Sequence, residues 1–191
     1  VFSPNIREQL CPEKLSGEGW LQVMREAHNL GLHSNATMLY GHVETPEDRI
    51  NHLIKLRELQ DETGGFMSFI PLAFHPKNTD LANRFGTTAM LDLKVISISR
   101  LMLDNFDHIK AFWIMLGIKL SQVSLSFGVD DIDGTVKEEK ITHAAGAETP
   151  EALSVQEIIN LIKEAGREPV ERDTLYNPVK RHQRNIVLQK V

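Results

Sequence analysis

The strongest constraint on the fold is a regular alternation between segments of helical period and short segments that are almost continuously apolar. An apolar segment without a polar face fits a strand buried on both sides, which is typical of parallel sheets covered by crossover helices. We therefore expect an α/β protein. The expected helices span residues 17–30, 46–63, 92–107, 117–127 and 155–165, and the expected strands span 34–40, 66–72, 109–115 and 129–133.

The number of these segments fits two architectures, an open doubly wound sheet or part of a (β/α) barrel. A complete barrel needs eight strands and typically about 250 residues, whereas we count four strands in this chain of 191 residues. We therefore predict half a barrel, with four parallel strands and crossover helices, over residues 1–177. Residues 178–191 contain four basic residues and no acidic one, and we expect them to form a solvated basic tail.

Capping residues mark the ends of several expected helices. Ser16 precedes the first helix as an N-cap, and Thr45 followed by Pro46 marks the start of the second. Ser154 and Glu157 have the spacing of a capping box before the last helix.

The charge balance and the single cysteine exclude several classes of function. The chain has 21 basic and 26 acidic residues, a formal net charge of −5, which argues against a general nucleic-acid binder. Cys11 alone excludes a disulfide framework and a multi-cysteine metal site within this chain. No apolar run approaches the roughly 20 residues of a membrane span, and no signal peptide opens the chain. We expect a cytoplasmic protein without nucleic-acid or membrane partners.

Polar residues gather after the expected strands, where parallel α/β proteins place their function. Residues 41–45 follow the first strand, and residues 71–78 follow the second. Asp130, Asp131 and Asp133 accompany the fourth, with a polar segment beyond them. This arrangement predicts a small-molecule site at one edge of the sheet.

Each candidate also has a simpler structural interpretation. His42 can be a surface loop residue, and Glu44 can favour the dipole of the helix that follows it. The three aspartates match turn chemistry better than EF-hand spacing. Arg100 and Asp104, one turn apart on the expected helix, can form a surface ion pair. The charged run 137–140 can be a solvated face.

The sequence contains no glycine-rich phosphate fingerprint, no P-loop and no GxSxG elbow, so spacing alone predicts an α/β enzyme of unspecified chemistry. Several longer segments resemble radical S-adenosylmethionine (SAM) enzymes of the menaquinone and deazaflavin pathways. Within that group the resemblance is closest to the aminofutalosine (aminodeoxyfutalosine) synthases, and it covers about Ile6 to Asn177. The segments that carry it are 35–46 (NATMLYGHVETP), 56–66 (LRELQDETGGF), 70–76 (IPLAFHP), 100–105 (RLMLDN), 133–141 (DGTVKEEKI), 143–147 (HAAGA) and 171–177 (ERDTLYN).

The resemblance implies a reaction and two cofactors. In such enzymes a 4Fe–4S cluster reduces SAM to methionine and a 5′-deoxyadenosyl radical. In aminofutalosine synthases this radical adds to the enolpyruvyl double bond of 3-[(1-carboxyvinyl)oxy]benzoate. The Cys-x-x-x-Cys-x-x-Cys loop that holds the cluster is absent here, and the chain starts at Val1 without a methionine. We therefore expect the C-terminal half of a TIM-type radical SAM barrel from menaquinone biosynthesis, inactive without its cluster-binding half.

The resemblance also implies roles for single residues. Residues 37–44 align with a fifth-strand SAM motif, in which Gly41 and Glu44 are retained while Thr37 and Leu39 replace a glycine and an isoleucine. An arginine suits a substrate carboxylate because its fork binds both oxygens, and a histidine can move a proton near neutral pH. The implied cofactor-binding residues are Thr37, Leu39, Gly41, His42, Glu44, Ile70 and Pro71; the implied catalytic residues are His75 and His143; the implied substrate-binding residues are Arg100, Glu138 and Glu139.

Three alternatives remain open at this point. The nearest relatives of the synthases are dehypoxanthine futalosine cyclase and the tyrosine-using subunit of deazaflavin synthase, and the segment Ala73–Pro76 favours the synthases. A self-contained half-barrel could instead serve as a non-catalytic binding module. Its open sheet edges would then need cover, which a homodimer could provide.

Overall fold

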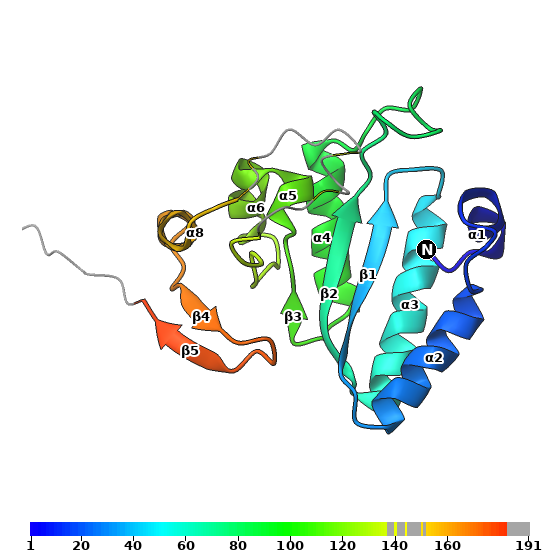
Figure 1. The fold of residues 1–191 in the computed structure, drawn as a ribbon, viewed down its shortest axis with the longest axis horizontal. Helices are drawn as coiled ribbons and strands as arrows, with labels where there is room; N and C mark the ends of the chain where they lie inside the picture. Colours follow the sequence, from blue (N-terminus) through cyan, green and yellow to red (C-terminus); the bar gives the residue numbers. More distant parts are fainter. Residues whose placement is uncertain (137–139, 141–143, 145–149, 151, 183–191) are drawn as a thin grey trace, which may run out of the picture.

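The computed structural model describes residues 1–136, 140, 144, 150 and 152–182. Helices and strands alternate through most of this part of the chain, as the sequence predicts (Figure 1). The elements are α1 (Pro4–Leu10), α2 (Gly17–Asn29), β1 (Ser34–Tyr40), α3 (Pro46–Thr63), β2 (Phe66–Ala73), α4 (Ala89–Met102), β3 (His108–Ile109), α5 (Trp113–Leu116), α6 (Ile118–Ser124), α8 (Val155–Glu164), β4 (Val170–Arg172) and β5 (Pro178–Arg181).

The central sheet has three parallel strands in the order β1-β2-β3. β1 and β2 pair along their whole length, up to Tyr40 opposite Ala73 at their carboxyl ends. β3 is short, and beyond it Lys110 forms a single parallel bridge with Asp131. A parallel α/β sheet is thus confirmed. The predicted fourth strand, 129–133, is reduced to that one bridge in the described part of the chain.

The strand predicted at 109–115 is wrong over most of its length. β3 ends at Ile109, and Trp113–Leu116 forms the helical turn α5. Trp113 and Ile114 are completely buried, so this segment is apolar on every side whether it forms a strand or a helix. A short apolar run of this kind does not distinguish a buried strand from a buried helix.

The predicted N-caps are confirmed. Ser16 accepts a backbone hydrogen bond from the first turn of α2. Thr45 and Asp48 form a reciprocal capping box at α3, and Ser154 and Glu157 form another at α8. These side chains satisfy backbone amides that have no partner inside the helix, so they fix where each helix begins.

The helix predicted at 92–107 starts and ends earlier than expected, because α4 spans Ala89–Met102. Asp104 therefore lies beyond the helix, and its carboxylate pairs with Arg57 of α3. The surface pair expected between Asp104 and Arg100 is wrong, since that spacing brings two side chains together only inside a helix.

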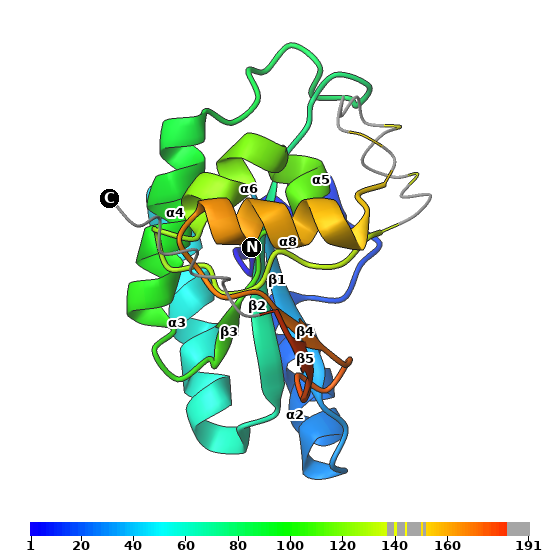
Figure 2. The same ribbon diagram turned by 90° about the vertical axis from the view of Figure 1, so that its left-hand side faces the viewer.

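α3 and α4 pack on one face of the sheet, and α2 packs against α3 (Figures 1 and 2). Side chains alternate between the two faces of a strand, so every second residue of β1 and β2 points to this helical layer. The fully buried core on the helical side includes Ala36, Met38, Tyr40, Leu53, Leu56, Phe69 and Ile96.

No helix in the described residues is long and apolar enough to cross a membrane.

We call the opposite side of the sheet the second face. It carries Asn35, Thr37 and Leu39 of β1, which are exposed or half-buried. The register places Ser68, Ile70 and Leu72 of β2 beside them, followed by His108 of β3 and by Lys110 just beyond that strand.

An antiparallel hairpin of β4 and β5, which the sequence did not predict, covers part of the second face (Figure 2). The ring of Tyr176 in its turn stacks on His108 at the start of β3, with centroids 3.9 Å apart. The expected basic tail begins at residue 178, so its first residues form β5, with exposed side chains. The expected boundary at residue 177 therefore falls inside the hairpin.

Candidate functional site

The carboxyl ends of β1 and β2 lie side by side, so the segments that follow them meet at one edge of the sheet. Gly41 comes directly after β1 and has a φ of +87°, a conformation that favours glycine. A Cβ added there would lie 2.3 Å from Cγ2 of Thr87, in the loop between β2 and α4. Gly41 thus permits both the turn and the close approach of that loop.

Glu44 holds this turn together. Its carboxylate accepts hydrogen bonds from the backbone amides of Gly41 at 2.6 Å and His42 at 2.9 Å, and from Nη1 of Arg49 at 2.6 Å. Its side chain is only 1% exposed. Burial alone would raise the pKa of Glu44, but these donors hold that pKa below its ordinary value. Glu44 is therefore an ionised group that shapes the strand end.

His42 is buried beside Glu44. The amide of Val43 donates to its Nδ1 at 2.7 Å, and its Nε2 lies 3.1 Å from the carbonyl oxygen of Leu39. Nδ1 also lies 3.0 Å from Oε2 of Glu44. Burial lowers the pKa of His42, so the neutral ring prevails. The two hydrogen bonds fix the ring inside the turn.

The implied cofactor-binding residues fall on both sides of the sheet. Thr37 is exposed, and Leu39 and Ile70 are half-buried; all three belong to the second face. Pro71 is buried and pairs with Met38, on the side covered by helices. The structure therefore brings Thr37, Leu39 and Ile70 together and separates Pro71 from them.

A buried pair that sequence reasoning missed fixes the loop after β2. The hydroxyl of Tyr40, at the end of β1, donates to Oδ1 of Asp92 in α4 at 2.8 Å. Burial raises the pKa of Asp92, while hydrogen bonds from Tyr40 and Thr87 oppose that rise. In the same loop, Nε2 of His75 lies 2.9 Å from the carbonyl oxygen of Met115 in α5. No spacing signal links such distant positions.

Arg100 lies at the opposite end of the strands, near the start of β3. Its Nε donates to the carbonyl of Gly128 at 2.8 Å, Nη1 to the carbonyl of Phe106 at 3.1 Å, and Nη2 to Asp130 at 2.8 Å. Each of its three nitrogens thus binds a protein oxygen. The implied substrate-binding residues Glu138 and Glu139, and the implied catalytic residue His143, lie outside the described residues.

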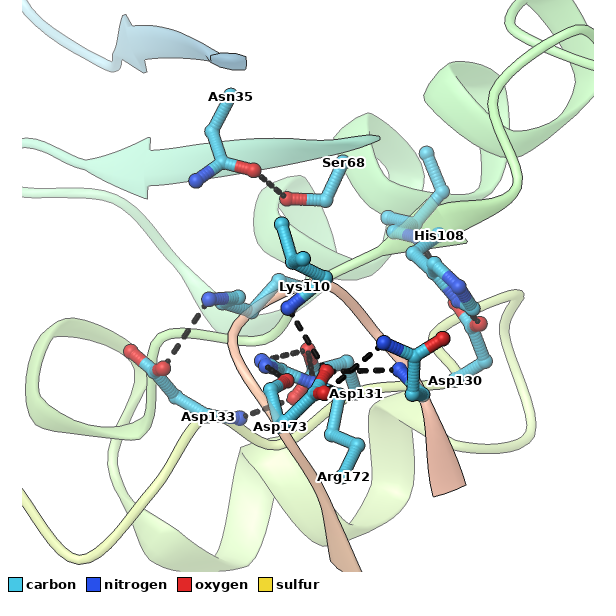
Figure 3. A network of polar contacts seen from close by, with 12 residues as sticks. Asn35, Ser68, His108, Lys110, Asp130, Asp131, Asp133, Arg172 and Asp173 are labelled. Atoms are coloured by element: carbon cyan, nitrogen blue, oxygen red, sulfur yellow. Dashed lines mark hydrogen bonds and ion pairs between the residues drawn. The ribbon is translucent and has the colours of Figure 1, made fainter. Parts of the chain in front are cut away.

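A polar network lies where the hairpin meets the second face (Figure 3). The carboxylate of Asp131 accepts hydrogen bonds from Nε and Nη2 of Arg172, the last residue of β4, at 2.9 and 2.5 Å. Lys110 pairs with Asp133 at 3.1 Å. The sequence singled out the aspartates, but it did not indicate their partners. The available signal was one cation, Lys110, inside the apolar run 109–115.

A family model of the CofH/MqnC C-terminal region matches residues 63–185 of this chain. The chain belongs to the CofH/MqnC family. The match begins in the last residue of α3 and extends past the hairpin, so it includes β2, the loop that follows it and the polar network.

Curated relatives support the same placement. The chain is 52% identical over 184 residues to aminodeoxyfutalosine synthase of Thermus thermophilus. It is 43% identical over 185 residues to the 5-amino-6-(D-ribitylamino)uracil–L-tyrosine 4-hydroxyphenyl transferase of Methanopyrus kandleri, and 44% over 187 residues to transferase 1 of that name from Methanosarcina barkeri. Each match covers 94% of this chain and 50% of the relative. The chain therefore spans about half the length of these CofH/MqnC relatives.

The described residues of this CofH/MqnC chain contain no group of three or more His, Cys, Asp or Glu side chains arranged to hold a metal ion. The full sequence has one cysteine, Cys11, whereas an iron–sulfur cluster needs several thiolates. A cluster therefore does not fit this chain. The second face is accessible next to Gly41, since Thr37 is exposed and Leu39 and Ile70 are half-buried.

Proposed function

We propose that this chain forms the C-terminal half of the barrel of an aminodeoxyfutalosine synthase, a radical SAM transferase of menaquinone biosynthesis in the cytoplasm. The observation that carries the proposal is the 52% identity to the Thermus thermophilus enzyme, against 43% and 44% to the two hydroxyphenyl transferases. The parallel strands, with polar segments at their carboxyl ends, support a barrel enzyme whose site lies at that edge.

When bound in the whole protein, SAM and a 4Fe–4S cluster supply the radical chemistry of such an enzyme. In this chain, Thr37, Leu39 and Ile70 would contact the adenosine part of SAM on the second face. Glu44 would act indirectly, because both of its oxygens already hold the turn at Gly41. The cluster ligands would come from the other half of the protein.

The remaining residues divide into two groups. His75 and His143 are the proposed proton-transfer groups, and Glu138 and Glu139 remain proposed substrate contacts. His75 follows the end of β2 by two residues, and its Nε2 lies 2.9 Å from the carbonyl oxygen of Met115 in α5. We leave Arg100 out of the site, because its three nitrogens bind Gly128, Phe106 and Asp130 at the other end of the sheet.

Product analysis of the whole protein tests the proposal. The anaerobically reconstituted protein is supplied with SAM and 3-[(1-carboxyvinyl)oxy]benzoate, and mass spectrometry should detect aminofutalosine. In parallel it receives 5-amino-6-(D-ribitylamino)uracil and L-tyrosine, the substrates in the names of the transferase relatives. Product from the second mixture alone would overturn the proposal in favour of the deazaflavin reaction. Dehypoxanthine futalosine serves as a third substrate, for the cyclase.

A second copy of this chain is a proposed partner. In the described residues, β1 pairs with β2 on one side only, so its outer edge resembles the edge strands that invite pairing. If the 191-residue chain is made alone, light scattering should find a dimer or larger species. A monodisperse monomer would contradict this, and a chain that then still bound carboxylate ligands would favour the binding-module alternative.

A further inference from the structure

Lys110 is a buried cation that the proposed site does not yet use. It is 8% exposed and lies on the second face, one residue beyond Ile109. Since Ile109 pairs with Phe69, Lys110 lies opposite Ile70, and Ile70 pairs with Thr37. Lys110 thus shares one row of the sheet with two of the proposed SAM-binding residues.

The ammonium group of Lys110 has fewer partners than it can accommodate. It carries three N–H donors, and among the described residues Nζ donates to one atom, Oδ1 of Asp133, at 3.1 Å (Figure 3). The neighbouring Asp131 is neutralised by Arg172 from the hairpin. Buried donors without acceptors are costly, so a ligand that supplied an acceptor to Lys110 would be stabilised.

Asp133 is held in a strained conformation that keeps its carboxylate on Lys110. Its φ of +59° is uncommon for a residue other than glycine. Its amide donates to Oδ1 of Asp131 at 2.7 Å, and the following carbonyl, of Gly134, accepts from Nε1 of Trp113 at 3.0 Å. Strain of this kind, fixed by surrounding contacts, is concentrated at ligand and active sites.

We propose that Lys110, positioned by Asp133, binds a carboxylate of the substrate at the end remote from the reacting atoms. The inference rests on the proposed function, whose substrate carries two carboxylates. The proposed reaction takes place at the strand ends, whereas the row of Lys110 lies deeper in the sheet than Tyr40 and Ala73. When the enolpyruvyl double bond of 3-[(1-carboxyvinyl)oxy]benzoate is placed at the strand ends, the ring carboxylate is the end of the substrate that is directed toward Lys110.

Calorimetric titration of the whole protein tests the inference. Two ligands are compared: 3-[(1-carboxyvinyl)oxy]benzoate and an analogue in which the ring carboxylate is a neutral carboxamide. The wild type should bind the acid about 10- to 100-fold more tightly than the amide, the effect of one charge-assisted hydrogen bond. Lys110→Gln should abolish this preference by weakening the acid alone. Lys94→Gln, an exposed lysine on α4, is the matched control and should change neither affinity.

Three results would overturn the inference: a wild type without preference for the acid, a Lys110→Gln variant that keeps the preference, or equal weakening of both ligands. Lys110→Arg keeps the positive charge and should keep the preference, which provides a test if Lys110→Gln does not fold. The proposed function is judged separately, by product. A wild type that prefers the acid but forms no aminofutalosine would overturn the proposed reaction and leave the carboxylate site standing.

Discussion

Replacing Gly41 with alanine tests how closely the loop after β2 approaches the end of β1. The added Cβ would occupy a residue with a φ of +87° and would lie 2.3 Å from Cγ2 of Thr87. A left-handed conformation costs a non-glycine residue about 1–2 kcal/mol, and overpacking costs about 1–3 kcal/mol. We therefore expect Gly41→Ala to lower the free energy of unfolding by about 2–5 kcal/mol.

Two further variants separate the backbone cost from the steric cost. Gly31 has a φ of +79° with no atom within 4 Å of an added Cβ, so Gly31→Ala should lose only about 1–2 kcal/mol. Thr87→Ser removes Cγ2, and in that background Gly41→Ala should cost about 1–3 kcal/mol less. Equilibrium urea unfolding followed by circular dichroism measures the wild type, the three single variants and the double variant of Gly41 and Thr87. The reasoning is refuted if Gly41→Ala costs no more than Gly31→Ala, or if Thr87→Ser gives no recovery.

Three further predictions concern Arg100, His52 and Asp92. Arg100→Met should lower the free energy of unfolding by about 2–4 kcal/mol, because three charged donors are lost and their partners are partly buried; weakened substrate binding at unchanged stability would contradict this. Burial lowers the pKa of His52 to about 3, so stability should fall as pH drops below 6.5, by about 3 kcal/mol at pH 4. His52→Gln should remove that part of the pH dependence in urea unfolding, and an unchanged slope would argue against it. Burial raises the pKa of Asp92, so its folded form keeps a proton that the unfolded chain loses, and stability should decline as pH rises above 3.8. Asp92→Asn should abolish this decline, and a parallel pH curve would contradict the assignment.

The starts of α2, α3 and α8 were predictable because capping chemistry is local. Thr45 with Asp48 and Ser154 with Glu157 satisfy amides within one turn, so three or four residues contain the whole signal. The strands at 34–40 and 66–72 were predictable for a related reason. Each is short, and each places alternate apolar side chains, such as Met38 and Phe69, in the core.

The segment around Trp113 was not predictable, because burial on all sides removes the periodicity that separates strand from helix. The hairpin was missed for the opposite reason. Most side chains of β4 and β5 are exposed, so these strands carry no apolar pattern. Their position depends on Arg172 and Tyr176, whose partners lie far away in the sequence.

The candidate site was predicted in outline only. The rule that functional residues follow the carboxyl ends of parallel strands predicted that Gly41 and Glu44 lie at the edge of the sheet, as they do. It could not predict that the Glu44 carboxylate binds backbone amides. Arg100 was selected for its chemistry, whereas its contacts depend on where α4 ends relative to Phe106. Lys110 was hidden inside an apolar run, and only the register across three strands gives its position.

The hairpin also dictates an order of assembly. Arg172 is separated by 41 residues from Asp131, its partner in the network, while β1 and β2 are joined by a single helix. Contacts over long loops form late because the chain entropy of closing them must be overcome first. During synthesis from the N-terminus, the paired strands therefore emerge with Ser68 and His108 still exposed to water. The start of β3 is covered only after the hairpin turn at Tyr176 has left the ribosome.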